Sequence, residues 1–177
     1  WGALIIRAAA KYGCFATGIT LSRNQYELAR ERIRAEGLEG RCEIRLQDYR
    51  DVTGQFDRIV SLGMFEHVGY KNYRTYMEVA HLLLPDEGLF LLHTIGGNRS
   101  VHTTDAWIEK YIFPNSMLPS IAQIGSSIEG LFVMEDWHNF GTDYDKTLQC
   151  WYKNFEAAWP GLTDHYGDPS TELRVGL

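Results

Sequence analysis

The sequence has few cysteines and no long hydrophobic run. Its three cysteines, Cys14, Cys42 and Cys150, are an odd number and lack the spacing of a metal site. We therefore expect buried thiols in a reducing compartment rather than metal ligands. No apolar stretch in the sequence is long enough to span a bilayer.

The sequence also lacks a block of basic residues. Its 17 basic and 23 acidic side chains give a net charge of -6. This balance does not favour nucleic acid as a partner. Because an acidic surface is repelled by anionic lipid head groups, contact with a membrane must use apolar side chains or other parts of the protein. A length of 177 residues and a hydrophobic content of 45% are typical of one globular domain.

Segments typical of strands and of helices alternate along the chain. Apolar or alternating runs predict strands, and apolar residues at helical spacing predict helices. The expected strands are 14–20, 42–46, 56–62, 89–95 and 132–137, and the expected helices are 3–12, 22–36, 71–84 and 145–159. The segment 96–130 is expected to be an insertion with one or two short helices. The alternation predicts an α/β fold with a doubly wound, mostly parallel sheet.

The two ends of the sequence lack elements that such a sheet requires. Trp1 and Gly2 lead directly into a helical pattern, with no strand and glycine turn before it. At the other end, residues 161–177 are polar and show no clear strand. We therefore expect a partial domain over 1–160, followed by a divergent tail over 161–177. Its first and last strands would be missing, which leaves a hole in the middle of the sheet.

One heptapeptide places ionisable groups directly after an apolar strand. Gly63-Met64-Phe65-Glu66-His67-Val68-Gly69 follows the run 56–62. In open α/β sheets, ligands bind at the carboxyl ends of the strands. The heptapeptide is therefore a candidate functional segment, although it could also be the start of a helix with a surface glutamate.

Several further segments occur in an order and spacing that point to one family. They are Trp1-Gly2, 18–25, 56–69, 92–96, 107–114, 135–141 and Asp143-Tyr144. Together they resemble the methyltransferase core of the cyclopropane fatty acid synthases, which are related to the mycolic acid cyclopropane synthases. The resemblance runs from Trp1 to about Trp159. It implies a Rossmann-like class I methyltransferase fold with a helical insertion.

The resemblance implies that S-adenosylmethionine binds at the carboxyl edge of the sheet. The implied cofactor-binding residues are Trp1, Gly2, Thr20, Leu21, Ser22, Gln25, Gln47, Asp48, Tyr49 and Leu62. Some of these residues also have simpler explanations. Ser22 and Gln25 have the spacing of a capping box, Asp48 could be a turn residue, and Leu62 could belong to the core.

The resemblance also implies a catalytic site that holds a bicarbonate ion. In the family this ion is the base that removes a proton from the transferred methyl group, so that the ring closes. Its implied partners are Glu66, His93, the backbone of Ile95 and the hydroxyl of Tyr144. Glu66 can accept the O–H of bicarbonate, while His93 and Tyr144 can donate to its oxygens. The plainer alternatives are a core histidine at position 93 and an aromatic residue at a helix start for Tyr144.

The implied function is that of a cyclopropane-fatty-acyl-phospholipid synthase core. Such a protein transfers a methylene group from S-adenosylmethionine to a cis double bond in an unsaturated phospholipid acyl chain. The implied location is cytoplasmic, peripheral to the inner face of the membrane, and an oligomer is possible. No metal is implied. Two alternatives stay open: an amine N-methyltransferase of the related alkaloid type, which shares the Met-Phe-Glu-His segment, and a catalytically inactive truncated remnant.

Overall fold

Helices and strands alternate through most of the chain. The structure, a computed structural model, describes residues 1–166 and divides after Val133 into two units, each of which is described by itself. The first unit contains α1 (Ala3–Tyr12), β1 (Ala16–Thr20), α2 (Arg23–Ala35), β2 (Cys42–Leu46), β3 (Arg58–Leu62), α3 (Tyr73–Leu82), β4 (Leu89–His93), α4 (Ala106–Tyr111) and α5 (Ile121–Ile128). Short 3-10 helices span Tyr49–Asp51, Phe65–His67 and Tyr70–Asn72. The second unit contains α6 (Gly141–Tyr166).

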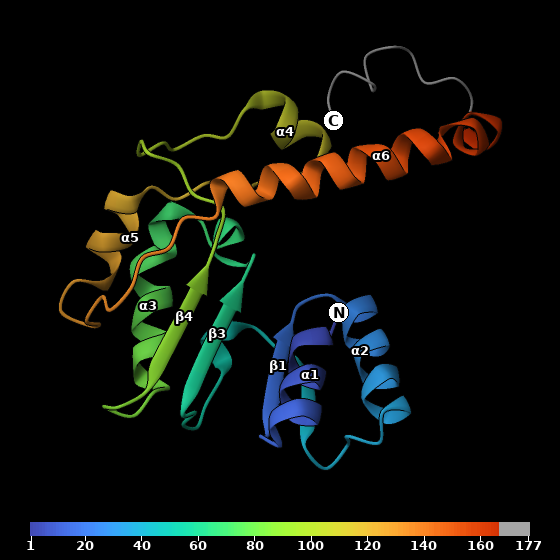
Figure 1. The fold of residues 1–177 in the computed structure, drawn as a ribbon. Coiled ribbons are helices and arrows are strands. Elements are labelled where there is room, and N and C mark those ends of the chain that lie inside the picture. The colour runs from blue at the N-terminus through green and yellow to red at the C-terminus, as the bar shows by residue number, and fades with distance from the viewer. Residues whose placement is uncertain (167–177) are drawn as a thin grey trace. The chain divides into compact units, whose positions relative to one another are not determined.

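The strands form two separate parallel pairs. β1 pairs with β2, and β3 pairs with β4, in registers that place Thr20 beside Leu46 and Leu62 beside His93. The arrows of β3 and β4 point the same way in Figure 1. Within the described residues, each of the four strands therefore has one neighbouring strand and one edge without a neighbour. The parallel pairing agrees with the predicted, mostly parallel sheet.

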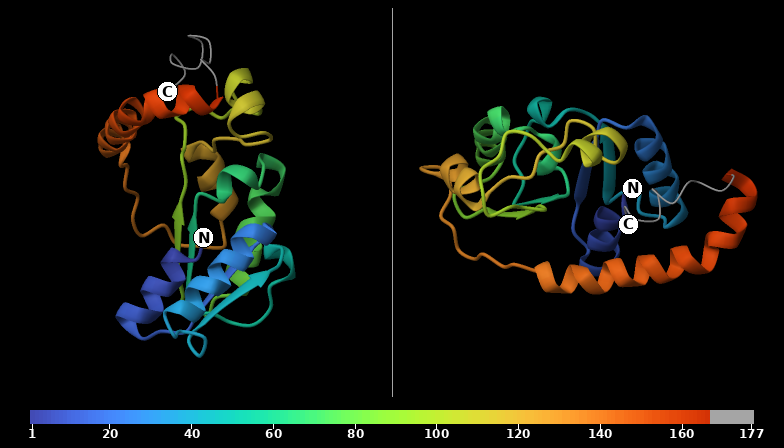
Figure 2. Two further views of the ribbon diagram at one scale, coloured as in Figure 1. Left: turned by 90° about the vertical axis from the view of Figure 1, so that its right-hand side faces the viewer. Right: turned by 90° about the horizontal axis from the view of Figure 1, so that it is seen from above.

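The first pair of strands is covered by α1 and α2, which lie side by side (Figure 2). Ala9, Ile33 and Cys42 form the buried cluster of this part. The Cys42 thiol donates to the carbonyl oxygen of Ile5 at 3.3 Å. Cys14 and Cys150, in contrast, are exposed. The expectation of buried thiols is therefore right for Cys42 and wrong for the other two.

The second pair of strands lies beside the larger core cluster, which contains residues of α3 and α5. Its buried members are Phe65, Tyr73, Tyr76, Met77 and Ile124. The rings of Phe65 and Tyr73 stack with their centroids 4.2 Å apart. The hydroxyls of Tyr76 and Ser61 form a buried hydrogen bond of 2.7 Å, which joins α3 to β3. This cluster positions the segment that follows β3.

Two predicted elements differ from the structure. Residues 132–137, predicted to be a strand, have no regular structure. Phe132 instead packs its ring against His81 and Phe90, with both centroid distances 5.6 Å, so this apolar residue is accommodated without strand pairing. The last predicted helix starts earlier, at Gly141, and continues through Pro160 to Tyr166. Figure 2 shows that α6 changes direction toward its C-terminal end, as a proline inside a helix favours.

The predicted tail is only partly described. Residues 161–166 continue α6, and 167–177 lie outside the described residues. Among the helices of residues 1–166, none combines the length and the apolar character that crossing a membrane requires.

Candidate active site

Glu66 lies just beyond the carboxyl end of β3. Gly63 has a φ of +61°, a backbone conformation that glycine adopts without a steric penalty. The chain turns there into the 3-10 helix Phe65–His67. Glu66 is 7% exposed, so the interpretation of a surface glutamate at a helix start is wrong. The backbone N–H of Gly63 donates to the carbonyl oxygen of His93 at 3.1 Å, which keeps the ends of β3 and β4 together.

The two carboxylate oxygens of Glu66 have different surroundings. Oε1 accepts a hydrogen bond of 2.8 Å from the backbone N–H of Ile95. Oε2 is buried and has no hydrogen-bond partner among the described residues. The backbone carbonyl of Glu66 accepts from the N–H of Met117 at 2.8 Å, so the insertion also holds this residue. Because buried polar atoms are nearly always paired, the free Oε2 is a place for a further donor.

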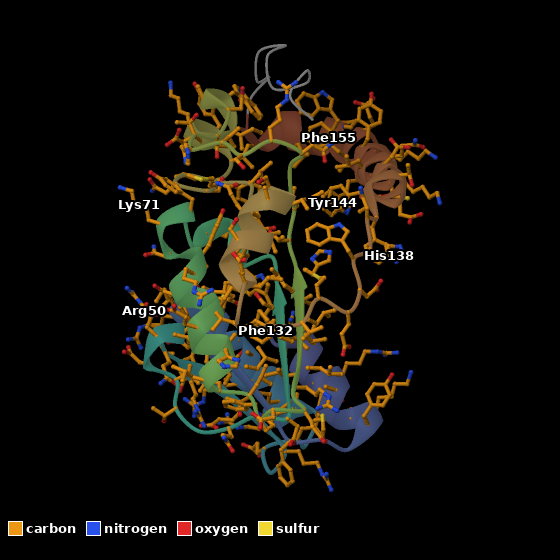
Figure 3. The ribbon with its side chains drawn as sticks, turned by 90° about the vertical axis from the view of Figure 1, so that its left-hand side faces the viewer. Arg50, Lys71, Phe132, His138, Tyr144 and Phe155 are labelled. Atoms are coloured by element: carbon orange, nitrogen blue, oxygen red, sulfur yellow. The ribbon has the colours of Figure 1, made fainter. Side chains whose placement is uncertain are left out.

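The other implied catalytic residues fall in two parts of the chain. His93 is the last residue of β4 and is exposed, so it is not a core histidine. Ile95 follows it, and the first unit therefore brings Glu66, His93 and Ile95 to the ends of two paired strands. Tyr144, labelled in Figure 3, belongs to α6 in the second unit. Its ring packs edge-on against that of Trp151, with the centroids 6.1 Å apart. Tyr144 lies in the first turn of α6, as expected for an aromatic residue at a helix start.

A polar network marks the carboxyl end of β1. The hydroxyl of Thr20 donates to Oε1 of Gln25 at 2.9 Å and accepts from the N–H of Ser22 at 3.1 Å. Ser22 is the N-cap of α2, and its hydroxyl accepts from the N–H of Gln25 at 3.3 Å. The helix-capping role is thus confirmed for Ser22. The reciprocal hydrogen bond of the capping box is not formed, because the N–H of Ser22 donates to Thr20 and the side chain of Gln25 accepts from Thr20.

The segment after β2 continues this polar edge. The N–H of Gln47 donates to the carbonyl oxygen of Thr20 at 3.1 Å, and its side chain donates to the carbonyl of Asp51 at 2.8 Å. Asp48 caps the following 3-10 helix and pairs with Arg50 at 2.7 Å; Figure 3 labels Arg50 at the periphery of the molecule. The hydrogen bond from the Arg50 side chain, followed by the one from its backbone, lowers the pKa of Asp48 from 3.8 to about 2. Asp48 is therefore a turn residue, as the simpler explanation holds, and stays ionised at neutral pH.

Apolar side chains lie next to these polar groups. The ring of Tyr49 packs edge-on against Tyr76 with centroids 5.0 Å apart, and burial raises the pKa of the Tyr49 hydroxyl. Leu62 is 49% exposed, so it is not plain core. Leu21 and Trp1 are also exposed, and the carbonyl oxygen of Trp1 accepts from the Arg32 side chain at 3.0 Å. Both polar side chains and exposed apolar side chains therefore lie at the carboxyl ends of β1 and β3.

Gly2 fills a position where a side chain has no room. Its φ is +85°, and a Cβ placed on it would lie 3.0 Å from Cβ of Ala29 in α2. A larger residue would therefore be strained and would also push α1 and α2 apart. This close approach is consistent with the predicted turn at Gly2.

Tyr73, the first residue of α3, was not predicted to be a site residue from the sequence. It is 3% exposed, and its hydroxyl has no hydrogen-bond partner among the described residues. The signal in the sequence is weak, because a tyrosine seven residues after Glu66 is an ordinary core residue at a helix start. Among residues 1–166, no group of three or more His, Cys, Asp or Glu side chains could hold a metal ion.

Comparison with known proteins identifies the family. The family model for mycolic acid cyclopropane synthetase matches residues 1–173. The chain belongs to this family. The cyclopropane-fatty-acyl-phospholipid synthase of Escherichia coli is 55% identical over 168 residues, which are 95% of this chain and 43% of that protein.

Two solved structures of the mycolic acid cyclopropane synthetase family share the fold. The cyclopropane synthase MmaA2 from Mycobacterium tuberculosis superimposes with a TM-score of 0.84 at 26% identity, and the mycolic acid cyclopropane synthase CmaA1 complexed with SAH and CTAB superimposes with 0.82 at 28%. Each match covers 95% of this chain and 64% of the other chain. The Rossmann-like α/β fold of class I methyltransferases is thus confirmed. The chain spans less than half of the E. coli relative and under two thirds of these two structures.

Proposed function

We propose that this chain is the catalytic core of a cyclopropane-fatty-acyl-phospholipid synthase. It would transfer a methylene group from S-adenosylmethionine to a cis double bond of an unsaturated phospholipid acyl chain. The identity of 55% with the E. coli synthase supports this substrate class. Within the structure, the proposal depends on Glu66, a buried carboxylate that is held by one oxygen and free at the other.

S-adenosylmethionine would bind along the ends of β1, β2 and β3. Its amino acid part can form hydrogen bonds with the polar network of Thr20, Ser22 and Gln25, whose members are already oriented by one another. The half-exposed side chain of Leu62 offers an apolar surface for the adenine, and Tyr49 offers an aromatic one. The residues present therefore fit the cofactor.

The free oxygen of Glu66 fits a small donor such as bicarbonate. When bound, a bicarbonate ion supplies the base for the proton of the transferred methyl group. Glu66 would accept the O–H of the ion at Oε2, and the exposed ring of His93 would donate to another oxygen. Because the N–H of Ile95 already donates to Oε1 of Glu66, we propose that Ile95 orients this carboxylate. Tyr144 is proposed as a further donor.

The partner that suits this reaction is an unsaturated phospholipid at a membrane surface. Exposed apolar side chains occur in and after α4, where Trp107, Tyr111, Ile112 and Phe113 are each at least 36% exposed. Such side chains can contact lipid although the net charge of -6 is unfavourable near anionic head groups. We propose a peripheral position at the inner face of the membrane.

A hybrid enzyme tests this proposal. The E. coli relative would carry this chain in place of its own matching segment, and its products would be assayed with unsaturated phospholipid vesicles, S-adenosylmethionine and bicarbonate. We expect cyclopropane fatty acids by mass spectrometry. Glu66→Gln should lower the rate about a hundredfold or more, as expected for a group that takes part in proton transfer.

Substitutions of His93 and His67 distinguish the lipid reaction from methylation of an amine. His93→Gln should lower cyclopropane formation, whereas His67→Gln should retain it, because His67 is exposed and its ring lies edge-on to that of Phe113, with the ring centroids 6.0 Å apart. An amine methyltransferase would instead depend on His67 and produce N-methylated amines. N-methylated products without any cyclopropane product would contradict the proposal.

A further inference from the structure

Two buried polar atoms in the first unit are left without hydrogen-bond partners. They are Oε2 of Glu66 and the hydroxyl oxygen of Tyr73, the two such side-chain atoms within the described residues. Glu66 is 7% exposed and Tyr73 3% exposed, so both side chains are more than nine-tenths buried. Buried side-chain polar atoms of folded proteins mostly have a partner, and each exception requires an explanation.

The packing of the core places the two residues in the same neighbourhood. The ring of Tyr73 stacks on that of Phe65, the residue directly before Glu66, with centroids 4.2 Å apart and planes inclined by 21°. Burial raises the pKa of the Tyr73 hydroxyl, and the negative charge of Glu66 raises it further. The phenol therefore lies within the electrostatic reach of the carboxylate.

The chemistry of the two groups is complementary. An ionised carboxylate can only accept hydrogen bonds, whereas a phenol can donate one. Oε1 of Glu66 already has its donor in the N–H of Ile95. Oε2 lacks a donor and the Tyr73 hydroxyl lacks an acceptor, so one water molecule that bridges them would satisfy both atoms.

We propose that Tyr73 is a positioning residue for Glu66, and that its hydroxyl is linked to Oε2 through one bridging water molecule. This inference rests on the proposed function of Glu66 as the partner of bicarbonate. With Ile95 on one oxygen and Tyr73 on the other, the plane of the carboxylate is fixed. Since a carboxylate oxygen has two lone pairs, Oε2 can still accept the O–H of bicarbonate.

Tyr73→Phe in the hybrid enzyme is the first test, because it removes the hydroxyl and retains the ring that stacks on Phe65. The bicarbonate concentration that gives half the maximal rate should rise by about tenfold to a hundredfold, the loss expected for a hydrogen bond to a charged group. The maximal rate and the KM for S-adenosylmethionine should change little. Tyr70→Phe is the matched control, since Tyr70 lies in the 3-10 helix before α3, is 37% exposed and packs on His102.

A second measurement leaves Tyr73 itself intact. Tyrosine labelled with carbon-13 at Cζ can be titrated by NMR in the full 177-residue chain, with Tyr73→Phe identifying the signal. Glu66→Gln should lower the pKa of Tyr73, because it removes the negative charge that raises it. A tyrosine with only a packing role beside a distant carboxylate would show no change.

The outcomes separate this inference from the proposed function. If Glu66→Gln abolishes the response to bicarbonate but Tyr73→Phe leaves it within about twofold of the parent, Tyr73 has no positioning role and the proposed function stands. If Glu66→Gln also leaves the response unchanged, Glu66 is not the bicarbonate partner and the proposed function fails. An unchanged pKa of Tyr73 in Glu66→Gln would likewise overturn the inference.

Discussion

At the scale of single residues, hydrogen bonds from the main chain determine what side chains can do. Glu66 is oriented by the N–H of Ile95, and Asp48 by Arg50. The sequence identified Glu66 as a functional candidate from its place after a strand. It could not show which oxygen stays free, because that depends on a contact between residues 29 positions apart. Tyr73 was not predicted for the same reason, because its environment depends on tertiary packing.

Gly2 provides a residue-scale prediction. Gly2→Ala should destabilise the chain by about 2–3 kcal/mol, because an alanine at positive φ is strained by about 1–2 kcal/mol and its Cβ would lie 3.0 Å from that of Ala29. Gly37→Ala is the control: Gly37 also has a positive φ, of +65°, but a Cβ there meets no atom within 4 Å. It should cost only the strain. Urea unfolding measures both values, and equal losses would show that the contact with Ala29 carries no weight.

At the scale of elements, the alternation of apolar residues was enough to predict β1 to β4 and α1 to α3. Each of these segments has one dominant period and ends at a glycine, a proline or a polar turn. The prediction failed at 132–137, where Phe132 packs into the core as a single residue rather than as part of a strand. It also placed the end of the last helix before Pro160. A proline disfavours the helix interior locally, but α6 continues past it.

The contact between α3 and β3 gives an element-scale prediction. Tyr76→Phe and Ser61→Ala should each cost about 1–3 kcal/mol of unfolding free energy, since each leaves the other hydroxyl buried without its partner. The double variant should cost less than the sum of the two. Chemical denaturation of the parent, the two single variants and the double variant gives the coupling free energy.

Tyr12→Phe is the control. It replaces an exposed tyrosine and should change the free energy of unfolding by less than about 0.5 kcal/mol. Additive losses would mean that the two hydroxyls do not support each other.

At the scale of the whole molecule, the chain consists of two units joined by an irregular segment. Residues 132–140 have no regular structure, and Val133 is 86% exposed. The fold class was predictable because alternating strands and helices admit few arrangements. The division after Val133 was not predictable, because the sequence around it does not have the composition of a linker.

This division predicts where a protease cuts first. A glutamate-specific protease under native conditions should cleave after Glu135 before it cleaves after Glu27 or Glu31, although all three are exposed. The latter two lie in α2, where the helix must open locally before the backbone fits a protease. Mass spectrometry of early digests should therefore show fragments 1–135 and 136–177. Cleavage within α2 before cleavage after Glu135 would contradict this prediction.

The hydrogen bond from Ile95 to Glu66 has a consequence for the evolution of the site. The donor is a backbone N–H, which every amino acid except proline possesses. The support of Glu66 is therefore independent of the side chain at position 95. The half-exposed side chain at position 95 can therefore be replaced by that of any residue except proline, while the carboxylate of Glu66 keeps this hydrogen bond.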